Sequence, residues 1–227
     1  MEFNGTEKYK KKLPLAFSVG IAALLFFTAA HTGGGQSGGT SGESAKIQAS
    51  KGKWKIFHVM SSHSPWTWAD DQFIGFKHAL KGLDIEYRVF QMDTFRKSSK
   101  EWIENAGREA RYLIDTWKPD LVYATDDYAQ KYVTTHYINW DTPFVFSGVN
   151  CDPKDYGFAG STNITGVLEE EHFIPTVKLL KEIALRVKKI GVIFDEDPTW
   201  SGVIKRMKKK QRYLPEVDFV RWDMITT

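Results

Sequence analysis

Four short polar segments stand out because each directly follows a run of apolar residues. They are Ser61–Trp68, Gln91–Phe95, Thr125–Tyr128 and Ser147–Asp152. If the apolar runs are parallel strands, all four segments lie at one edge of a sheet, where open α/β sheets bind their ligands. The hydroxyls, carboxylates and indole rings gathered there suit the binding of a small molecule.

Nine residues in or opposite these segments are the predicted ligand-binding residues. They are Ser61, Ser62, Trp66, Trp68, Asp126, Asp127, Ser147, Asn150 and Trp200. Serine hydroxyls and free backbone amides suit an anionic group such as a carboxylate. The alternative for each serine is that it only satisfies turn or cap groups of the backbone.

The aromatic residues and the aspartates each allow two interpretations. Trp66 and Trp68 could sandwich a flat ligand or face a cation, or they could pack the loop onto the first helix. Trp200 could close on the same ligand from a second lobe. The pair Asp126–Asp127 is either a helix cap with a solvated neighbour or a carboxylate for a ligand ammonium. The glutamates at 169–171 mark the crossing between lobes, where they form a solvated hinge or one carboxylate reaches the ligand.

Patterns typical of enzymes are absent from the sequence. There is no Gly-x-Ser-x-Gly elbow, no His-Glu-x-x-His and no dinucleotide fingerprint after the first strand. Histidines are scattered without metal-ligand spacing, and Cys151 is the one cysteine, with no identifiable catalytic partner. We therefore expect no catalysis, no cofactor and no metal.

Alternating strands and helices predict a doubly wound α/β lobe over residues 53–167. Strands are expected at Lys53–Met60, Ile85–Phe90, Asp120–Ala124 and Pro143–Ser147, with a further short strand at Ile164–Leu168. Thr67 is expected to cap the first helix, and Ser98 with Glu101 to form a capping box for the second. Such alternation implies a parallel sheet.

The pattern restarts after Glu171, which predicts a hinge and the start of a second α/β lobe over residues 168–227. A helix is expected at Phe173–Val187, with Ile174, Val177, Leu180 and Ile183 facing inward. The strand Lys189–Asp195 follows, then a helix capped by Asp197, and then a strand at Leu214–Trp222. Because one or two strands do not bury a sheet, we expect this lobe to be incomplete.

The N-terminal residues have the composition of an export signal. Residues 1–30 carry four lysines before the apolar run Leu13–Ala30, which predicts a signal peptide or, if it is not cleaved, a membrane anchor. Residues 31–52 are rich in Gly, Ser and Thr and predict a flexible linker. We therefore expect a periplasmic or other extracytoplasmic protein that meets the membrane only through this segment.

Charge is balanced in the rest of the chain. Six of the 31 Lys and Arg residues and three of the 28 Asp and Glu residues lie in the first 52 positions, which leaves 25 of each beyond them. A neutral folded part argues against nucleic acid as a partner.

Four segments together resemble a known family. "PFVFSGVNCDP", "STNITGVLEE", "FIPTVKLLKEI" and "VKKIGVIFDEDPTWS" occur in the order found in the extracytoplasmic substrate-binding proteins of ABC transporters, in the group that includes tryptophan-type binders. The resemblance implies the two-lobe periplasmic-binding-protein-like fold, with a ligand held between lobes that close around a hinge. The sequence "TDD" at 125–127 and the tryptophan-rich first loop depart from the family pattern and leave the ligand class open.

The predicted function is therefore the solute-binding component of an ABC uptake transporter, with a small-molecule ligand and a permease as partners. The ligand could be an amino acid, an amine or an aromatic compound. Two alternatives remain open: the ligand-sensing ectodomain of a membrane receptor, and an exported α/β hydrolase.

Overall fold

The computed structural model describes residues 53–225. The predicted signal segment at 1–30 and the linker at 31–52 lie outside these residues. Within the described range, no helix is long and apolar enough to span a bilayer.

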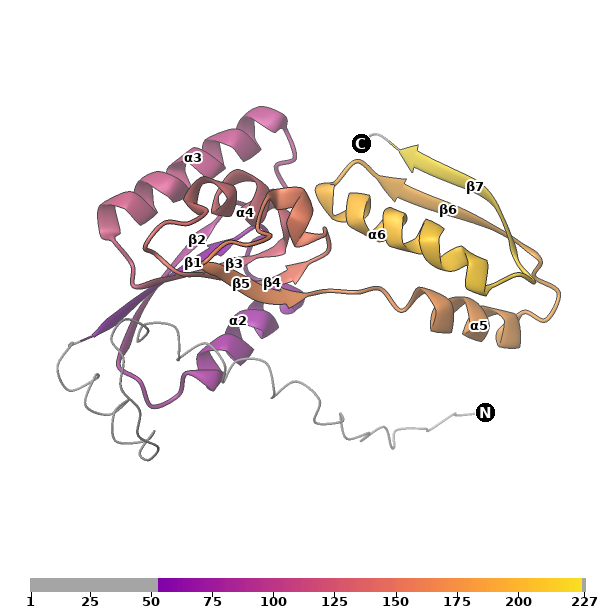
Figure 1. The fold of residues 1–227 in the computed structure, drawn as a ribbon, viewed down its shortest axis with the longest axis horizontal. Helices are drawn as coiled ribbons and strands as arrows, with labels where there is room; N and C mark the ends of the chain where they lie inside the picture. The colour runs from indigo at the N-terminus through magenta and orange to yellow at the C-terminus, as the bar shows by residue number, and fades with distance from the viewer. Residues whose placement is uncertain (1–52, 226–227) are drawn as a thin grey trace, which may run out of the picture. The chain divides into compact units, whose positions relative to one another are not determined.

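The first lobe is built on a sheet of five parallel strands (Figure 1). Its strands and α-helices are β1 (Trp54–Met60), α2 (Thr67–Ala79), β2 (Ile85–Gln91), α3 (Lys100–Trp117), β3 (Leu121–Thr125), α4 (Asp126–Tyr132), β4 (Phe144–Val149) and β5 (Ile164–Leu168). The strand order is β2-β1-β3-β4-β5, which is that of a doubly wound sheet. The predicted fold class, α/β with a parallel central sheet, is confirmed.

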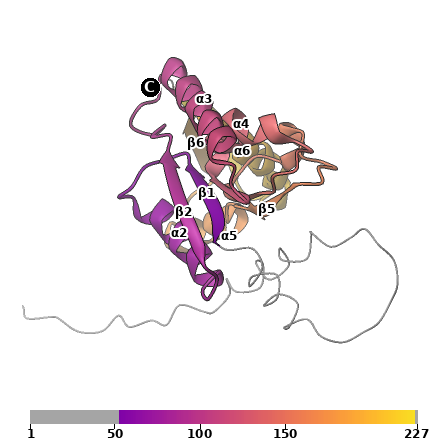
Figure 2. The same ribbon diagram turned by 90° about the vertical axis from the view of Figure 1, so that its left-hand side faces the viewer.

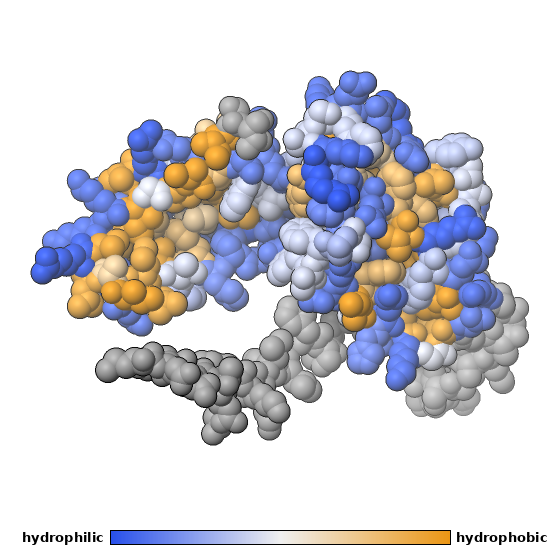
Figure 3. All heavy atoms as spheres, turned by 180° about the vertical axis from the view of Figure 1, so that it is seen from behind, coloured by the Kyte–Doolittle hydropathy of each residue, from blue (hydrophilic) through white to orange (hydrophobic). Residues whose placement is uncertain are grey.

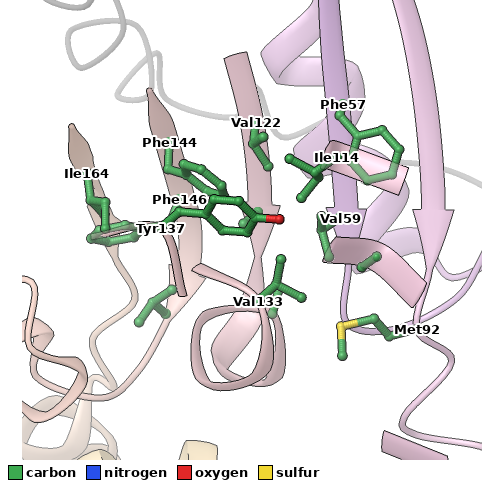
Figure 4. Packing of buried hydrophobic residues seen from close by; sticks show 14 of the residues in the cluster. Phe57, Val59, Met92, Ile114, Val122, Val133, Tyr137, Phe144, Phe146 and Ile164 are labelled. Carbon is green, nitrogen blue, oxygen red and sulfur yellow. The ribbon is translucent and has the colours of Figure 1, made fainter. Parts of the chain in front are cut away.

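Helices cover both faces of this sheet, with α3 and α4 on one face and α2 on the other (Figures 1 and 2). Successive residues of a strand point to opposite faces. On β1, Phe57 and Val59 join the core beneath α3 and α4 (Figure 4), whereas Ile56 packs with Phe76 of α2 and Tyr123. The central strands β1, β3 and β4 are largely apolar and largely buried, whereas β2, at an edge of the sheet, is more exposed and carries Glu86 and Arg88.

Two expected helix caps are displaced by one residue. Trp66, not Thr67, is the N-cap of α2, and Asp70 in the first turn accepts a hydrogen bond from the backbone N–H of Trp66 (2.9 Å). Ser99, not Ser98, caps α3 by accepting from the backbone N–H of Trp102. At α3 two neighbouring serines of equal capping ability compete, whereas at α2 the extended backbone of Trp66 sets the start of the helix without a side-chain cap.

The second lobe contains a two-stranded parallel sheet with two helices on one of its faces (Figure 1). Its elements are α5 (Phe173–Ile183), β6 (Lys189–Asp195), α6 (Pro198–Lys210) and β7 (Asp218–Ile225). The small core gathers Phe173, Val177, Leu214 and Val217. On the opposite face of the sheet Ile193 is 68% exposed, and hydrophobic residues cover much of this lobe's surface in Figure 3.

Two predictions for the second lobe were wrong in detail. Helix α5 ends at Ile183 rather than Val187, and Leu180 and Ile183 are 40% and 76% exposed rather than inward. Its first turns alone find apolar partners, because the small sheet extends no further. The last strand begins at Asp218 rather than Leu214, since Leu214 is buried in a turn and Pro215 has no N–H for a ladder.

The chain passes from the first lobe to the second directly after β5. Strand β5 pairs with β4, and the backbone N–H of Glu169 donates to the carbonyl of Val149 (2.8 Å). Helix α5 begins at Phe173. The crossing therefore consists of the four residues 169–172.

Candidate functional site

A cleft of about 350 Å³ lies at the carboxyl end of the first sheet and reaches α6. Its lining residues are Trp66, Trp68, Phe95, Asp126, Gly148, Asn150, Glu169, Glu171, Thr199, Trp200 and Val203. Each of the four polar segments singled out in the sequence contributes at least one of them. The volume falls in the range of small-molecule sites.

Aromatic rings form one wall of this cleft. Trp66 meets Phe95 edge to face, with ring centroids 5.1 Å apart, and it lies parallel to the ring of His63. Trp66, Trp68 and Phe95 are 38%, 48% and 43% exposed, so large apolar areas face outward here. Such rings lose water when a flat or apolar ligand covers them.

Asp126 lies at the base of the cleft as the first residue of α4. Its backbone is in the left-handed region, with φ of 64°, although it is not glycine. The side chain is 7% exposed, and its Oδ2 atom is buried without a hydrogen-bond partner within the described part of the chain. A buried acceptor left unpaired is costly.

The environment of Asp126 disfavours its charged form. Burial, followed by the negative charges of Asp127 and Glu169, raises the pKa of Asp126 to about 7. Burial likewise raises the pKa of Glu169 and of Asp197. Several carboxyl groups therefore lie in or near the cleft, in surroundings that oppose their ionisation.

Asp127 has a different environment, although it is the next residue. Its carboxylate accepts hydrogen bonds from the backbone N–H groups of Asn150 (2.9 Å) and Cys151 (3.0 Å), and from the hydroxyl of Tyr156 (2.7 Å). The residue is 1% exposed and does not line the cleft. Its carboxylate holds the loop after β4 in place. The proposed ligand site therefore does not include Asp127.

The loop after β4 supplies polar cleft residues. The side chain of Asn150 donates to Glu169 (3.3 Å), which joins this loop to the interlobe crossing. Gly148 has φ of 68°, and a Cβ atom there would lie 2.7 Å from Oδ1 of Asp126. Only glycine fits this position without displacing the aspartate.

The three predicted serines lie behind the cleft rather than in its lining. Ser61 is fully buried, donates to the carbonyl of Thr125 (2.6 Å) and accepts from the N–H of Ala129 (2.8 Å). Ser147 bonds with the hydroxyl of Tyr123 (2.6 Å) and donates to Gln72 (2.7 Å). Ser62 is fully buried, and its hydroxyl has no partner among the described residues. We do not carry these serines into the proposed site.

Helix α6 brings Thr199, Trp200 and Val203 to the cleft from the second lobe. Asp197 caps the helix as expected, accepting from the N–H of Thr199 (2.8 Å), and Pro198 is at the first position. A Cβ atom on Gly202 would lie 2.3 Å from the carbonyl oxygen of Asn150. The helix and the loop after β4 are thus in direct backbone contact.

An ion-pair cluster ties α6 to the crossing. Arg206 donates to Glu171 through Nε (2.9 Å) and Nη2 (2.7 Å), and through Nη1 to the carbonyl of Asn150. Lys210 donates to Glu171 as well (3.3 Å). Although burial opposes it, these partners hold the pKa of Glu171 below its usual value.

Five of the nine predicted residues line the cleft: Trp66, Trp68, Asp126, Asn150 and Trp200. The cleft is also lined by four residues that were not predicted, Phe95, Gly148, Thr199 and Val203, and by Glu169 and Glu171, for which a solvated hinge was the favoured prediction. Phe95 and Gly148 fall inside segments that were recognised, so their position next to a strand end was the available signal. Thr199 and Val203 line the cleft because α6 packs beside it, and no pattern in the sequence predicts which residues of that helix face the cleft.

No protein-family model matches this sequence, and no curated protein sequence matches it. Solved structures do resemble it. One is the ABC domain from Streptococcus pneumoniae in complex with L-Trp, which has a TM-score of 0.57 at 14% identity. The match covers 78% of this chain and 58% of that one.

Two further solved structures give a TM-score of 0.51 and cover 77% of this chain. One is the ligand-free, open structure of a substrate-binding protein with adhesive properties from Clostridium difficile, at 21% identity over 58% of that chain. The other is an ABC-transporter solute-binding protein from Rhodopseudomonas palustris in complex with 4-hydroxybenzoate, at 15% identity over 47% of that chain.

This chain spans about half to three-fifths of the length of these structures. At such identities the likeness establishes the fold: an α/β fold with a parallel central sheet, shared with solute-binding proteins. Two of these structures are described as substrate- or solute-binding proteins, and two contain a bound small molecule.

Proposed function

We propose that this protein is an extracytoplasmic solute-binding protein that holds a small organic ligand between the edge of its first sheet and α6. The observation that carries the proposal is the composition of the cleft. Aromatic rings from both lobes surround one buried carboxylate, Asp126, that has no hydrogen-bond partner in the described structure. Apolar walls with a few convergent polar groups are typical of small-molecule sites.

The crossing at 169–172 is proposed to act as the hinge. It is short, and the contacts that bring α6 against the first lobe involve the backbone of Asn150 and the ion pairs of Glu171. Such contacts can break and re-form as the lobes open and close. The two lobes, 53–167 and 168–227, would then be the bodies that move.

Transport is proposed as the purpose of binding. The fold shared with ABC solute-binding proteins and the export signal expected at 1–30 together support delivery of the ligand to an ABC permease. L-Trp and 4-hydroxybenzoate, the ligands of two structural neighbours, are flat aromatic molecules of a size that fits a cleft of about 350 Å³.

A ligand panel tests the proposal on the whole chain. The panel contains indole and phenol compounds, each with an amine, an alcohol, a carboxylate or an amino-acid group, together with glucose and glutamate. We expect at least one aromatic compound to raise the melting temperature and to quench tryptophan fluorescence without being consumed. Turnover of the compound would favour an exported hydrolase instead.

A matched pair of variants locates the binding. Trp66→Ala removes an indole that lines the cleft, and Trp140→Ala removes an indole that is 54% exposed and does not line it. We expect Trp66→Ala to weaken binding at least tenfold, which corresponds to about 1.4 kcal/mol, and Trp140→Ala to leave it unchanged. Equal affinity in both variants, or no binding by any aromatic compound, contradicts the proposal.

A further inference from the structure

The charged residues that line the cleft are all acidic. They are Asp126, Glu169 and Glu171, and no Lys, Arg or His is among the lining residues of the described chain. Arg206 and Lys210 are both bonded to Glu171. Glu171 is therefore directly paired with cations, whereas Glu169 only feels the charge of Arg206 and no cation of the described residues acts on Asp126.

The carboxyl groups of Asp126 and Glu169 line the cleft and can accept more hydrogen bonds than the surrounding residues donate to them. Oδ2 of Asp126 has no partner, and Glu169 accepts from the amide of Asn150. Hydrogen bonding from the side chain of Gln72 lowers the pKa of Asp126, but Gln72 does not line the cleft, and its amide is neutral. Two carboxylates thus dominate the polar chemistry that a ligand meets.

A ligand carboxylate would be unfavourable in this position. It would lose its hydration and gain no cation, and it would lie near two groups of its own charge. A ligand ammonium would have the opposite effect, because an opposite charge a few ångströms away stabilises both groups. The N–H groups of the ammonium would also supply the hydrogen-bond donor that Oδ2 of Asp126 lacks.

The aromatic wall is compatible with the same charge. Trp66, Trp68, Phe95 and Trp200 line the cleft around the two carboxylates. The face of an indole ring attracts a cation, and its area packs against a flat hydrocarbon body. The aromatic rings and the two carboxyl groups therefore both favour a cationic aromatic molecule.

We propose that the ligand is an aromatic amine with a protonated N–H group and without a carboxylate, bound through Asp126 and Glu169. This inference rests on the proposed function, because it assumes that the cleft is the ligand site. It excludes aromatic amino acids and aromatic acids as preferred ligands. It also excludes quaternary ammonium compounds, which have no N–H to donate to Asp126.

Four indole compounds of nearly equal shape test the inference on the whole chain by calorimetry: tryptamine, tryptophol, L-tryptophan and N,N,N-trimethyltryptammonium. The matching phenol compounds, beginning with tyramine, form a second series. We expect the primary amine of at least one series to bind at least tenfold more tightly than its alcohol and its trimethyl form. We expect it to bind at least a hundredfold more tightly than the amino acid.

Asp126→Asn tests the role of the carboxylate with almost no change in shape, and Glu169→Gln is a second such variant. Asp71→Asn, an exposed residue of α2 that does not line the cleft, is the matched control. We expect Asp126→Asn to reduce the preference for the amine over the alcohol at least tenfold and Asp71→Asn to preserve it. Circular dichroism of each variant verifies folding.

The outcomes separate the two proposals. If the alcohol, the amino acid or the trimethyl compound binds as tightly as the amine, and Trp66→Ala still weakens that binding, the inference is overturned and the proposed function stands. If no compound of either series binds, or if Trp66→Ala has no effect, both are overturned.

Discussion

The ends of β1 and β3 each carry two identical residues in succession, Ser61–Ser62 and Asp126–Asp127, and the structure treats the members of each pair differently. Ser61 and Asp127 have two and three hydrogen bonds, whereas the hydroxyl of Ser62 and one oxygen of Asp126 have none within the described chain. The bonded members hold loops in place. Of the other two, only Asp126 reaches the cleft. A missing partner therefore indicates a ligand only where the cleft also reaches the side chain.

The largest effect is expected from Asp127→Ala. It leaves the N–H groups of Asn150 and Cys151 and the hydroxyl of Tyr156 without their acceptor. At about 1–3 kcal/mol for each of these three groups, we expect the free energy of unfolding to fall by roughly 3–9 kcal/mol. Urea unfolding measures it. A loss below about 1 kcal/mol would remove the distinction drawn between the two aspartates.

Gly148→Ala is expected to come next. Besides adopting φ of 68°, the new methyl group would lie 2.7 Å from Oδ1 of Asp126 and 2.9 Å from Oε1 of Gln72. Gly160→Ala is the matched control, because Gly160 has φ of 79° and open space around it. Both variants pay about 1–2 kcal/mol for the left-handed backbone. We expect Gly148→Ala alone to weaken ligand binding, and equal affinities in the two variants would contradict a role for Asp126.

The charge of Asp126 is expected to give a smaller effect that depends on pH. Since burial and neighbouring carboxylates raise its pKa to about 7 in the folded chain, from 3.8 as the ordinary value, folding takes up a proton between these values. The contribution of Asp126 to stability is therefore present at low pH and is lost as the pH rises from about 4 to 7.

Asp126→Asn isolates this contribution because an amide does not titrate in this range. We expect the stability of the variant minus that of the original chain to increase between about pH 4 and 7 and to level off above, by about 1–3 kcal/mol in total. Urea unfolding at a series of pH values measures the difference. A difference that stays constant with pH would mean that the carboxylate of Asp126 has a stabilising partner in the folded chain, as that of Asp127 has.

The serine pair is expected to give the smallest contrast. Ser61→Ala removes a donor to Thr125 and an acceptor for Ala129, so we expect a loss of about 1–3 kcal/mol. Ser62→Ala removes a hydroxyl without a partner, and we expect a change within about 0.5 kcal/mol. Urea unfolding of both variants measures these two changes in the free energy of unfolding. A similar loss in both would show that Ser62 has a bonding role that its geometry does not suggest.

The first lobe could be predicted well from the sequence because its central strands are largely apolar and buried. A largely apolar run such as "IFHVM" favours a strand between two helical layers, and the polar residues beyond it then mark a sheet edge. The parallel order and the four loops at one edge follow from this constraint. The second lobe was less predictable, because a small sheet with one open face imposes less on residues such as Leu180 and Ile183.

The candidate site could be predicted to the level of segments but not of individual side chains. Asp126 and Asp127 have the same chemistry and adjacent positions, and only the local backbone decides which carboxylate meets the N–H groups of Asn150 and Cys151. Contributions from α6 depend on contacts between residues distant in sequence. The cap of α2 depended in the same way on the conformation of Trp66, which neither capping preference nor spacing determines.

Gly202 gives experimental access to the width of the cleft. It has no side chain at the place where α6 touches the loop after β4, and a methyl group would lie 2.3 Å from the carbonyl oxygen of Asn150 and 2.7 Å from the Cα of Cys151. Each carbon added at this position is therefore a spacer between the two lobes. A series from glycine through alanine to valine would hold α6 at increasing distances from the loop, with the ligand-contacting side chains unaltered.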